Sequence, residues 1–93
     1  MPIGFNIQNK LKTELEVFLK YLSQSNDSLY GNVEKEKKSI NDILKDIDSN
    51  KKIDTREIDF LIAPTGGLQE ISINSGWGKE FLVIAEKIDN IIK

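Results

Sequence analysis

The sequence predicts an all-α fold: a compact bundle of four main helices, with one additional short helix as an option. Two observations predict it. Apolar residues recur every three or four positions over most of the 93-residue chain, which is the period of a helix that buries one face. Only Ile71–Asn74 also alternates like a strand, and a lone strand would have no partner. A chain of this length has one modest core, so residues 1–93 are expected to form a single helical domain.

The first predicted helix runs from Gln8 to Leu22. Its apolar residues fall at i, i+4, i+7, i+8 and i+11, which places them on one face: Leu11, Leu15, Phe18, Leu19 and Leu22. Small polar residues then occupy positions 23–28, and Gly31 follows. Because such side chains compete with the backbone for hydrogen bonds, this segment is expected to be a loop.

The second predicted helix begins near Asn32, whose side chain can cap it. Its inward residues share the helical period: Val33, Ile40, Ile43, Leu44 and Ile47. Glu and Lys fill positions 34–38 at its start. These residues are expected to form a solvated face stabilised by i,i+4 pairs.

A short third helix is predicted to start at a variant capping box made by Asp54 and Glu57. Three apolar residues would point inward: Ile58, Leu61 and Ile62. Pro64 is expected to end this helix, because proline disfavours a helical conformation at the preceding residue and has no backbone N–H to donate.

Thr65-Gly66-Gly67 is expected to be a turn. The same residues could be imagined as a phosphate cradle at a helix start, but they lack the lysine and the spacing of a P-loop. Leu68 to Ser75 then fits a two-turn helix stopped by Gly76. Helix is preferred over strand for this segment.

The final segment has the clearest helical period, with its apolar residues at Phe81, Ile84, Ala85, Ile88, Ile91 and Ile92. Trp77 precedes it and stands between two glycines. Its indole could close the end of a small core, with its N–H bonded to a carbonyl, or it could serve as an interface anchor. The core role is preferred.

The composition argues against an enzyme, and no catalytic residue is assigned. The chain has no cysteine and no histidine, which removes thiolate sites, the commonest general base near neutral pH and the usual zinc ligands. No apolar run approaches the length of a membrane span, and the first residues have no basic n-region. The expected location is therefore the cytoplasm, without a membrane partner.

The net charge of −2 is unevenly distributed. Residues 53–93 carry four basic and seven acidic groups, so the carboxyl half is the acidic half. No concentrated basic field is visible, so nucleic acid is not an expected partner. Three carboxylates lie at the start of the third predicted helix, where they could face a basic protein: Asp54, Glu57 and Asp59.

Residues 46–57 resemble the twelve-residue calcium loop of EF-hand proteins. Oxygen-bearing side chains occupy loop positions 1, 3, 5, 9 and 12: Asp46, Asp48, Asn50, Asp54 and Glu57. Lys51 replaces the glycine of the sharp turn, and Lys52 and Arg56 add positive charge. Calcium binding is therefore the alternative function, and a polar interhelical loop followed by an N-cap is the preferred interpretation.

Phe60–Glu70, followed by Gly76-Trp77-Gly78 and an acidic, apolar final helix, resembles the small helical immunity proteins of bacterial contact-dependent growth inhibition systems. The resemblance covers the carboxyl-terminal third. It implies a cytoplasmic protein that binds a cognate toxin domain, often a nuclease, and masks its active site or substrate surface. The acidic carboxyl half is compatible with a basic partner, because complementary charge speeds association. The expected partner-binding residues are Asp54, Glu57, Asp59, Glu70, Trp77 and Glu80.

Overall fold

Five helices make up the computed structural model, which describes residues 3–64 and 66–93 and contains no strand within them. In chain order they are α1 (Ile3–Leu22), α2 (Val33–Asp48), α3 (Thr55–Leu61), α4 (Gly67–Asn74) and α5 (Gly78–Ile92). The prediction of an all-α bundle is confirmed, and the optional short helix exists as α4. Thr65, part of the predicted turn, lies outside the described residues.

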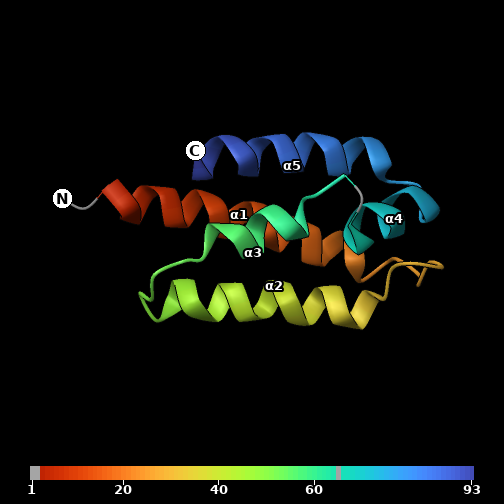
Figure 1. The fold of residues 1–93 in the computed structure, drawn as a ribbon, viewed down its shortest axis with the longest axis horizontal. Helices are drawn as coiled ribbons and strands as arrows, with labels where there is room; N and C mark the ends of the chain where they lie inside the picture. The colour runs from red at the N-terminus through yellow and green to blue at the C-terminus, as the bar shows by residue number, and fades with distance from the viewer. Residues whose placement is uncertain (1–2, 65) are drawn as a thin grey trace.

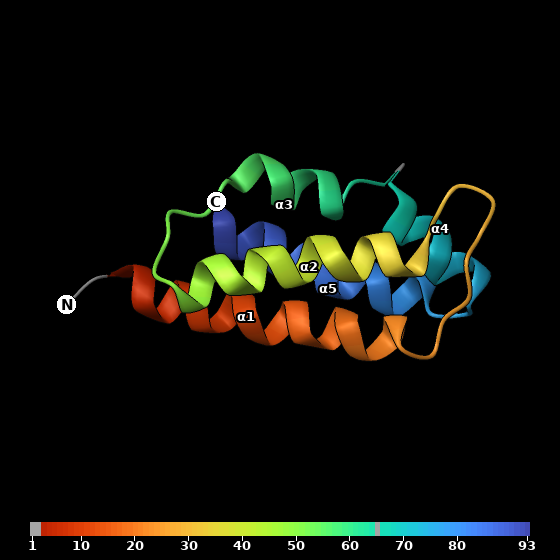
Figure 2. The same ribbon diagram turned by 90° about the horizontal axis from the view of Figure 1, so that it is seen from below.

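The three long helices lie side by side, and the two short helices close the bundle (Figure 1). Helix α1 packs against both α2 and α5, and α4 packs against α5 and α2 at one end. Seen from below, α3 lies on the opposite side of the bundle from α1 (Figure 2). The molecule is elongated, measuring 43 × 21 × 20 Å.

A single apolar core runs between the helices. Most of the residues predicted to face inward are buried, including Leu11, Leu15, Phe18, Leu22, Ile40, Ile43, Ile58, Leu61, Phe81 and Ile88. Six others are only partly buried and pack against this core from its edge: Leu19, Leu44, Ile62, Ala85, Ile91 and Ile92. The helical period therefore identified the core correctly, because each helix buries one stripe of its surface.

Side-chain caps fix the starts of two helices. The Asn32 Oδ1 accepts a hydrogen bond from Lys35 N at 2.9 Å, as predicted for α2. The Asp54 Oδ1 accepts from Arg56 N at 2.9 Å and starts α3. The predicted capping box is only half formed, because no hydrogen bond among the described residues joins the Glu57 carboxylate to the Asp54 N–H. The Glu57 side chain is left exposed to solvent.

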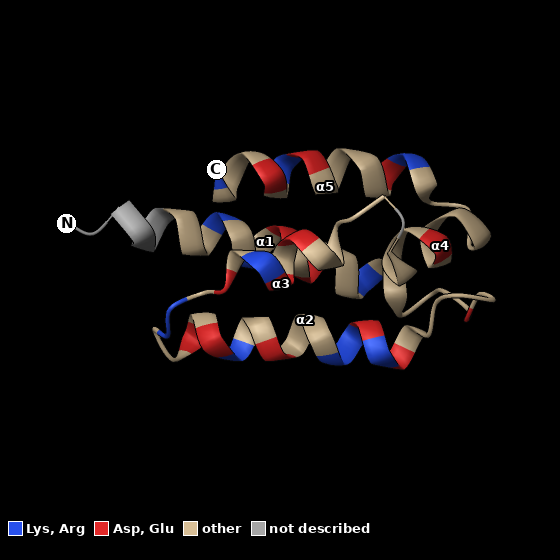
Figure 3. Ribbon diagram, in the orientation of Figure 1, with Lys and Arg blue, Asp and Glu red and all other residues tan. Residues whose placement is uncertain are grey.

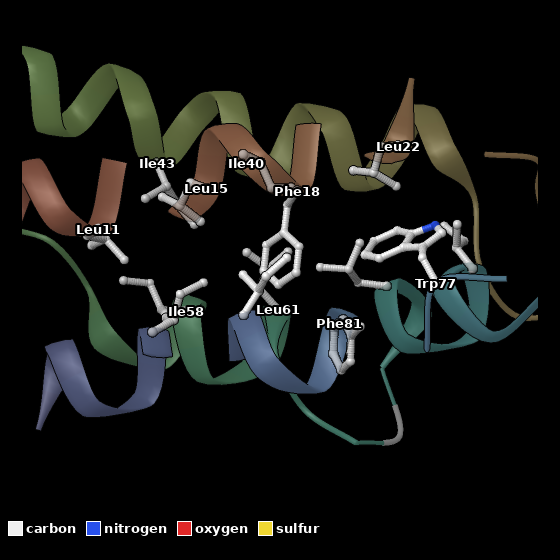
Figure 4. Packing of buried hydrophobic residues seen from close by; sticks show 14 of the residues in the cluster. Leu11, Leu15, Phe18, Leu22, Ile40, Ile43, Ile58, Leu61, Trp77 and Phe81 are labelled. Atoms are coloured by element: carbon white, nitrogen blue, oxygen red, sulfur yellow. The ribbon is translucent and has the colours of Figure 1, made fainter. Parts of the chain in front are cut away.

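Trp77 closes the core at the α4 end of the bundle. Only 5% of its surface is exposed. Its ring stacks on Tyr21 at a centroid distance of 4.8 Å and lies near Phe18 and Phe81, as Figure 4 shows for the last two. The indole Nε1–H donates to Ser25 Oγ at 2.8 Å rather than to a carbonyl. The core role is the one that the structure shows.

The charged start of α2 is less solvated than its sequence predicted. Glu36 is half-buried, and its carboxylate lies against Gly67 at the start of α4, where a Cβ atom would meet it at 3.1 Å. Burial raises the pKa of the Glu36 carboxyl, and nearby Lys35 opposes this effect. Gly67 is about thirty residues from Glu36 in sequence, so the local charge pattern could not reveal this contact.

Candidate partner-binding surface

Helix α3 has one buried face and one exposed face. Ile58 and Leu61 point into the core, with 0% and 5% of their surfaces exposed. At about 100° per residue, Asp59 and Phe60 between them face away from the core. Arg56 and Glu57 in the preceding turn are also outside this buried stripe, and all four residues are exposed. Phe60 has 81% of its surface exposed, which is unusual for a large aromatic side chain.

A groove separates α3 from α5. Its apolar lining comes from the segment after α3 and the first half of α5: Ile62, Ala63, Pro64, Phe81, Leu82 and Ala85. Its charged lining residues are Asp59, Glu86 and Asp89, all of them acidic. The groove thus combines apolar and acidic lining residues.

A second hollow, a cleft, separates α3 from α2. It is lined by Ser39, Asp42, Ile43, Glu57 and Phe60. The charged lining residues are again acidic. Helix α3 therefore stands between two hollows whose charged residues are acidic, while a further hollow beside Glu57 also contains Lys45 and Lys51.

Some of these carboxylates already have a partner in the chain. Asp42 pairs with Lys38 at 3.1 Å, and Asp89 pairs with Lys93 at 3.0 Å. In the part of the chain that the structure describes, no ion pair involves Glu57, Asp59 or Glu86. Figure 3 shows the acidic positions of α3 between acidic positions on α2 and α5, with basic positions interspersed.

The predicted partner-binding residues do not form one cluster. Glu57 and Asp59 lie on opposite sides of α3 and line the two hollows. Glu70 and Glu80 lie in the first turns of α4 and α5 and line neither of them. Trp77 belongs to the core, so its side chain is not available as a surface anchor.

Asp54, the remaining predicted residue, has a structural task. Its carboxylate caps α3 and lies 3.5 Å from Arg56 Nε. The acidic and the exposed large apolar lining residues that were not among the candidates are Asp42, Phe60, Leu82, Glu86 and Asp89. The sequence contains one indication of this surface: Phe60 does not share the helix face of the inward residues Ile58 and Leu61.

The loop after α2 does not gather the oxygens of a calcium site. Among the described residues, no group of three or more acidic, histidine or cysteine side chains is arranged to hold a metal ion. Asp48 instead binds Lys12 Nζ from α1 at 3.0 Å, and this contact raises the pKa of Lys12. Asn50, with φ at 57°, makes the turn in place of a glycine. The loop therefore lacks the convergence that the EF-hand resemblance implies.

No helix in the described parts of the chain has both the length and the apolar character needed to cross a membrane. Comparisons with known proteins give no relative: no protein-family model, curated protein or solved structure matches this chain. The chemistry of the surface around α3 therefore carries the functional inference.

Proposed function

We propose that this chain is an immunity-type binding protein, which captures a toxin domain with a basic, partly apolar surface and masks it. The observation that carries the proposal is the exposed face of α3 between two hollows whose charged lining residues are all acidic. The α3 surface is defined here by its exposed lining residues: Asp42, Glu57, Asp59, Phe60, Leu82 and Glu86.

Exposed apolar side chains favour a protein as the partner. Phe60 is 81% exposed, and Leu82 on the other side of α3 is 56% exposed. Burying a side chain of this size contributes about 1.5–3 kcal/mol. Aromatic residues surrounded by polar ones are typical centres of protein interfaces. Phe60 is therefore the expected anchor of the complex.

Charge favours a basic partner. Glu57, Asp59 and Glu86 carry negative charge without an ion pair among the described residues. A complementary positive surface would be steered towards them and would dissociate more slowly once seated. The same charges would repel nucleic acid and anionic lipid.

The toxin class rests on the resemblance of the carboxyl-terminal third to small helical immunity proteins. Such a protein inhibits by occupying a surface and needs no catalytic group of its own. A nuclease domain has the basic substrate surface that the α3 surface would complement. Masking by the α3 surface then accounts for both the charge and the exposed phenylalanine.

The proposal requires a cognate toxic protein, and neutralisation of a toxic protein encoded beside this chain tests it. Co-expression of wild-type chain should restore growth, while the Phe60→Asp variant and the Asp59→Lys/Glu86→Lys double variant should not. Glu16→Lys, an exposed change on α1, is the matched control and should protect. Failure of the wild-type chain to protect, or full protection by the α3 variants, would contradict the proposal. Circular dichroism of each variant checks that it is folded.

A further inference from the structure

The groove between α3 and α5 is apolar at one end and acidic at the other. Along α5 its lining residues are Phe81, Leu82, Ala85, Glu86 and Asp89, and the last four form one stripe of i, i+3, i+4 and i+7. This stripe extends about 10 Å at 1.5 Å per residue. Leu82 is at its apolar end, and Asp89 is at its acidic end.

The α3 side of the groove has the same polarity. Helices α3 and α5 run in opposite directions (Figure 1). The acidic Asp59 therefore lies towards the Glu86 end of the stripe, and Ile62 and Pro64 lie towards the Leu82 end. Apolar side chains are gathered at one end and carboxylates at the other.

The carboxylates at the acidic end are open to a new partner. Asp59 and Glu86 form no ion pair within the described residues. Asp89 holds Lys93 at 3.0 Å, but the lysine side chain is 70% exposed. An exposed pair of this kind contributes little to stability and can be exchanged for another cation.

We infer that this groove accepts one amphipathic helix of the partner. The helix places an apolar side chain beside Leu82 and basic side chains one and two turns further on, opposite the carboxylates of Glu86 and Asp89. This inference rests on the proposed function and names the element that the toxin domain presents. A helix fits because its i, i+4 and i+7 positions match the stripe on α5.

Other occupants fit the groove less well. A second copy of this chain seated in the same way would bring carboxylates against carboxylates, which is unfavourable. An extended peptide that binds by strand addition would need an unpaired sheet edge for its backbone, and the described residues contain no strand. Anionic lipid and nucleic acid would be repelled by the acidic end.

A peptide probe tests the inference. The probe is a helix-favouring Ala/Gln peptide of about 15 residues with leucine at one position and arginine four and seven residues later. Its matched control carries glutamate in place of both arginines. In NMR spectra of the labelled wild-type protein, the arginine peptide should shift the amide signals of Ala63, Leu82 and Glu86. The glutamate peptide should not, and added salt should weaken binding.

Charge-neutralising variants sharpen the test. Glu86→Gln and Asp59→Asn should each weaken binding of the arginine peptide about twofold to fivefold. Glu16→Gln, an exposed change on α1 and outside the groove, should leave it unchanged. Equal binding of the two peptides, shifts centred on Leu29 and Tyr30, or no effect of Glu86→Gln would overturn the inference, as would self-association of the chain through the groove.

The two proposals can fail separately. Toxin neutralisation that needs Phe60 while the arginine peptide shifts no groove signal would refute the helix and leave the proposed function standing. Specific peptide binding without any neutralisation would refute the immunity role and leave the groove as a helix-binding site.

Discussion

Two regions of the molecule use aromatic residues in opposite ways. At the α4 end, Trp77 is 5% exposed, is surrounded by Tyr21, Phe18 and Phe81, and has its N–H satisfied by Ser25. On the seven-residue helix α3, Phe60 is 81% exposed and contributes to a cleft. This α4 end, called the aromatic end below, is buried and should stabilise the fold. The α3 surface is exposed and should be free to bind a partner.

The first prediction concerns the aromatic end and has the largest effect. Trp77→Ala should lower the free energy of unfolding by about 3–5 kcal/mol, because it removes a buried aromatic ring and leaves a cavity. Trp77→Phe keeps part of the ring packing and should cost less. Urea unfolding measures both. A loss below about 1 kcal/mol for Trp77→Ala would show that the aromatic end does not hold the fold.

The second prediction concerns the cap of α3. Asp54→Ala should cost about 1 kcal/mol, because the Arg56 N–H loses its acceptor. The effect should be seen first as faster amide hydrogen exchange in α3, because only two buried side chains anchor this short helix to the core. Asp54→Asn keeps an acceptor and is the control. Unchanged exchange in Asp54→Ala would mean that packing alone fixes α3.

Helix periods and caps could be predicted because they depend on neighbours along the chain. Leu15 and Ile40 are buried, and Asn32 caps α2, as local rules require. The acidic surface could be predicted only in part. Glu57 and Asp59 are close in sequence, but Glu86 joins Asp59 in one groove only because α5 runs beside α3.

Two local patterns gave an incomplete description for the same physical reason. Asp48 has the spacing of the alternative calcium interpretation, and its carboxylate binds Lys12 on another helix. Glu36 lies in a charged run that was expected to be solvated, yet it is half-buried against the start of α4. In both cases a contact distant in sequence decides the environment.

The third prediction, smaller in effect, concerns the pKa of Glu36, which burial raises. The folded chain therefore holds this proton more tightly than the unfolded chain. Its free energy of unfolding should fall as pH rises through the interval between the ordinary and the raised pKa. Glu36→Gln should remove that decline and stabilise the protein at neutral pH.

Unfolding midpoints between pH 4 and pH 8, a range that spans the ordinary carboxyl pKa, measure this effect. Glu16→Gln, an exposed change on α1, should preserve the wild-type pH dependence. Lower stability of Glu36→Gln at neutral pH would show instead that the carboxylate supports the start of α4.

The most direct test of the central claim compares two exposed aromatic residues. Phe60 lies on the α3 surface, and Tyr30, 77% exposed, lies in the loop before α2. Phe60→Ser and Tyr30→Ser should each change the free energy of unfolding by less than about 0.5 kcal/mol. Calorimetric titration with the toxin domain should show at least tenfold weaker binding for Phe60→Ser and wild-type affinity for Tyr30→Ser. Equal affinity of Phe60→Ser and the wild type, or a loss confined to Tyr30→Ser, would contradict the account.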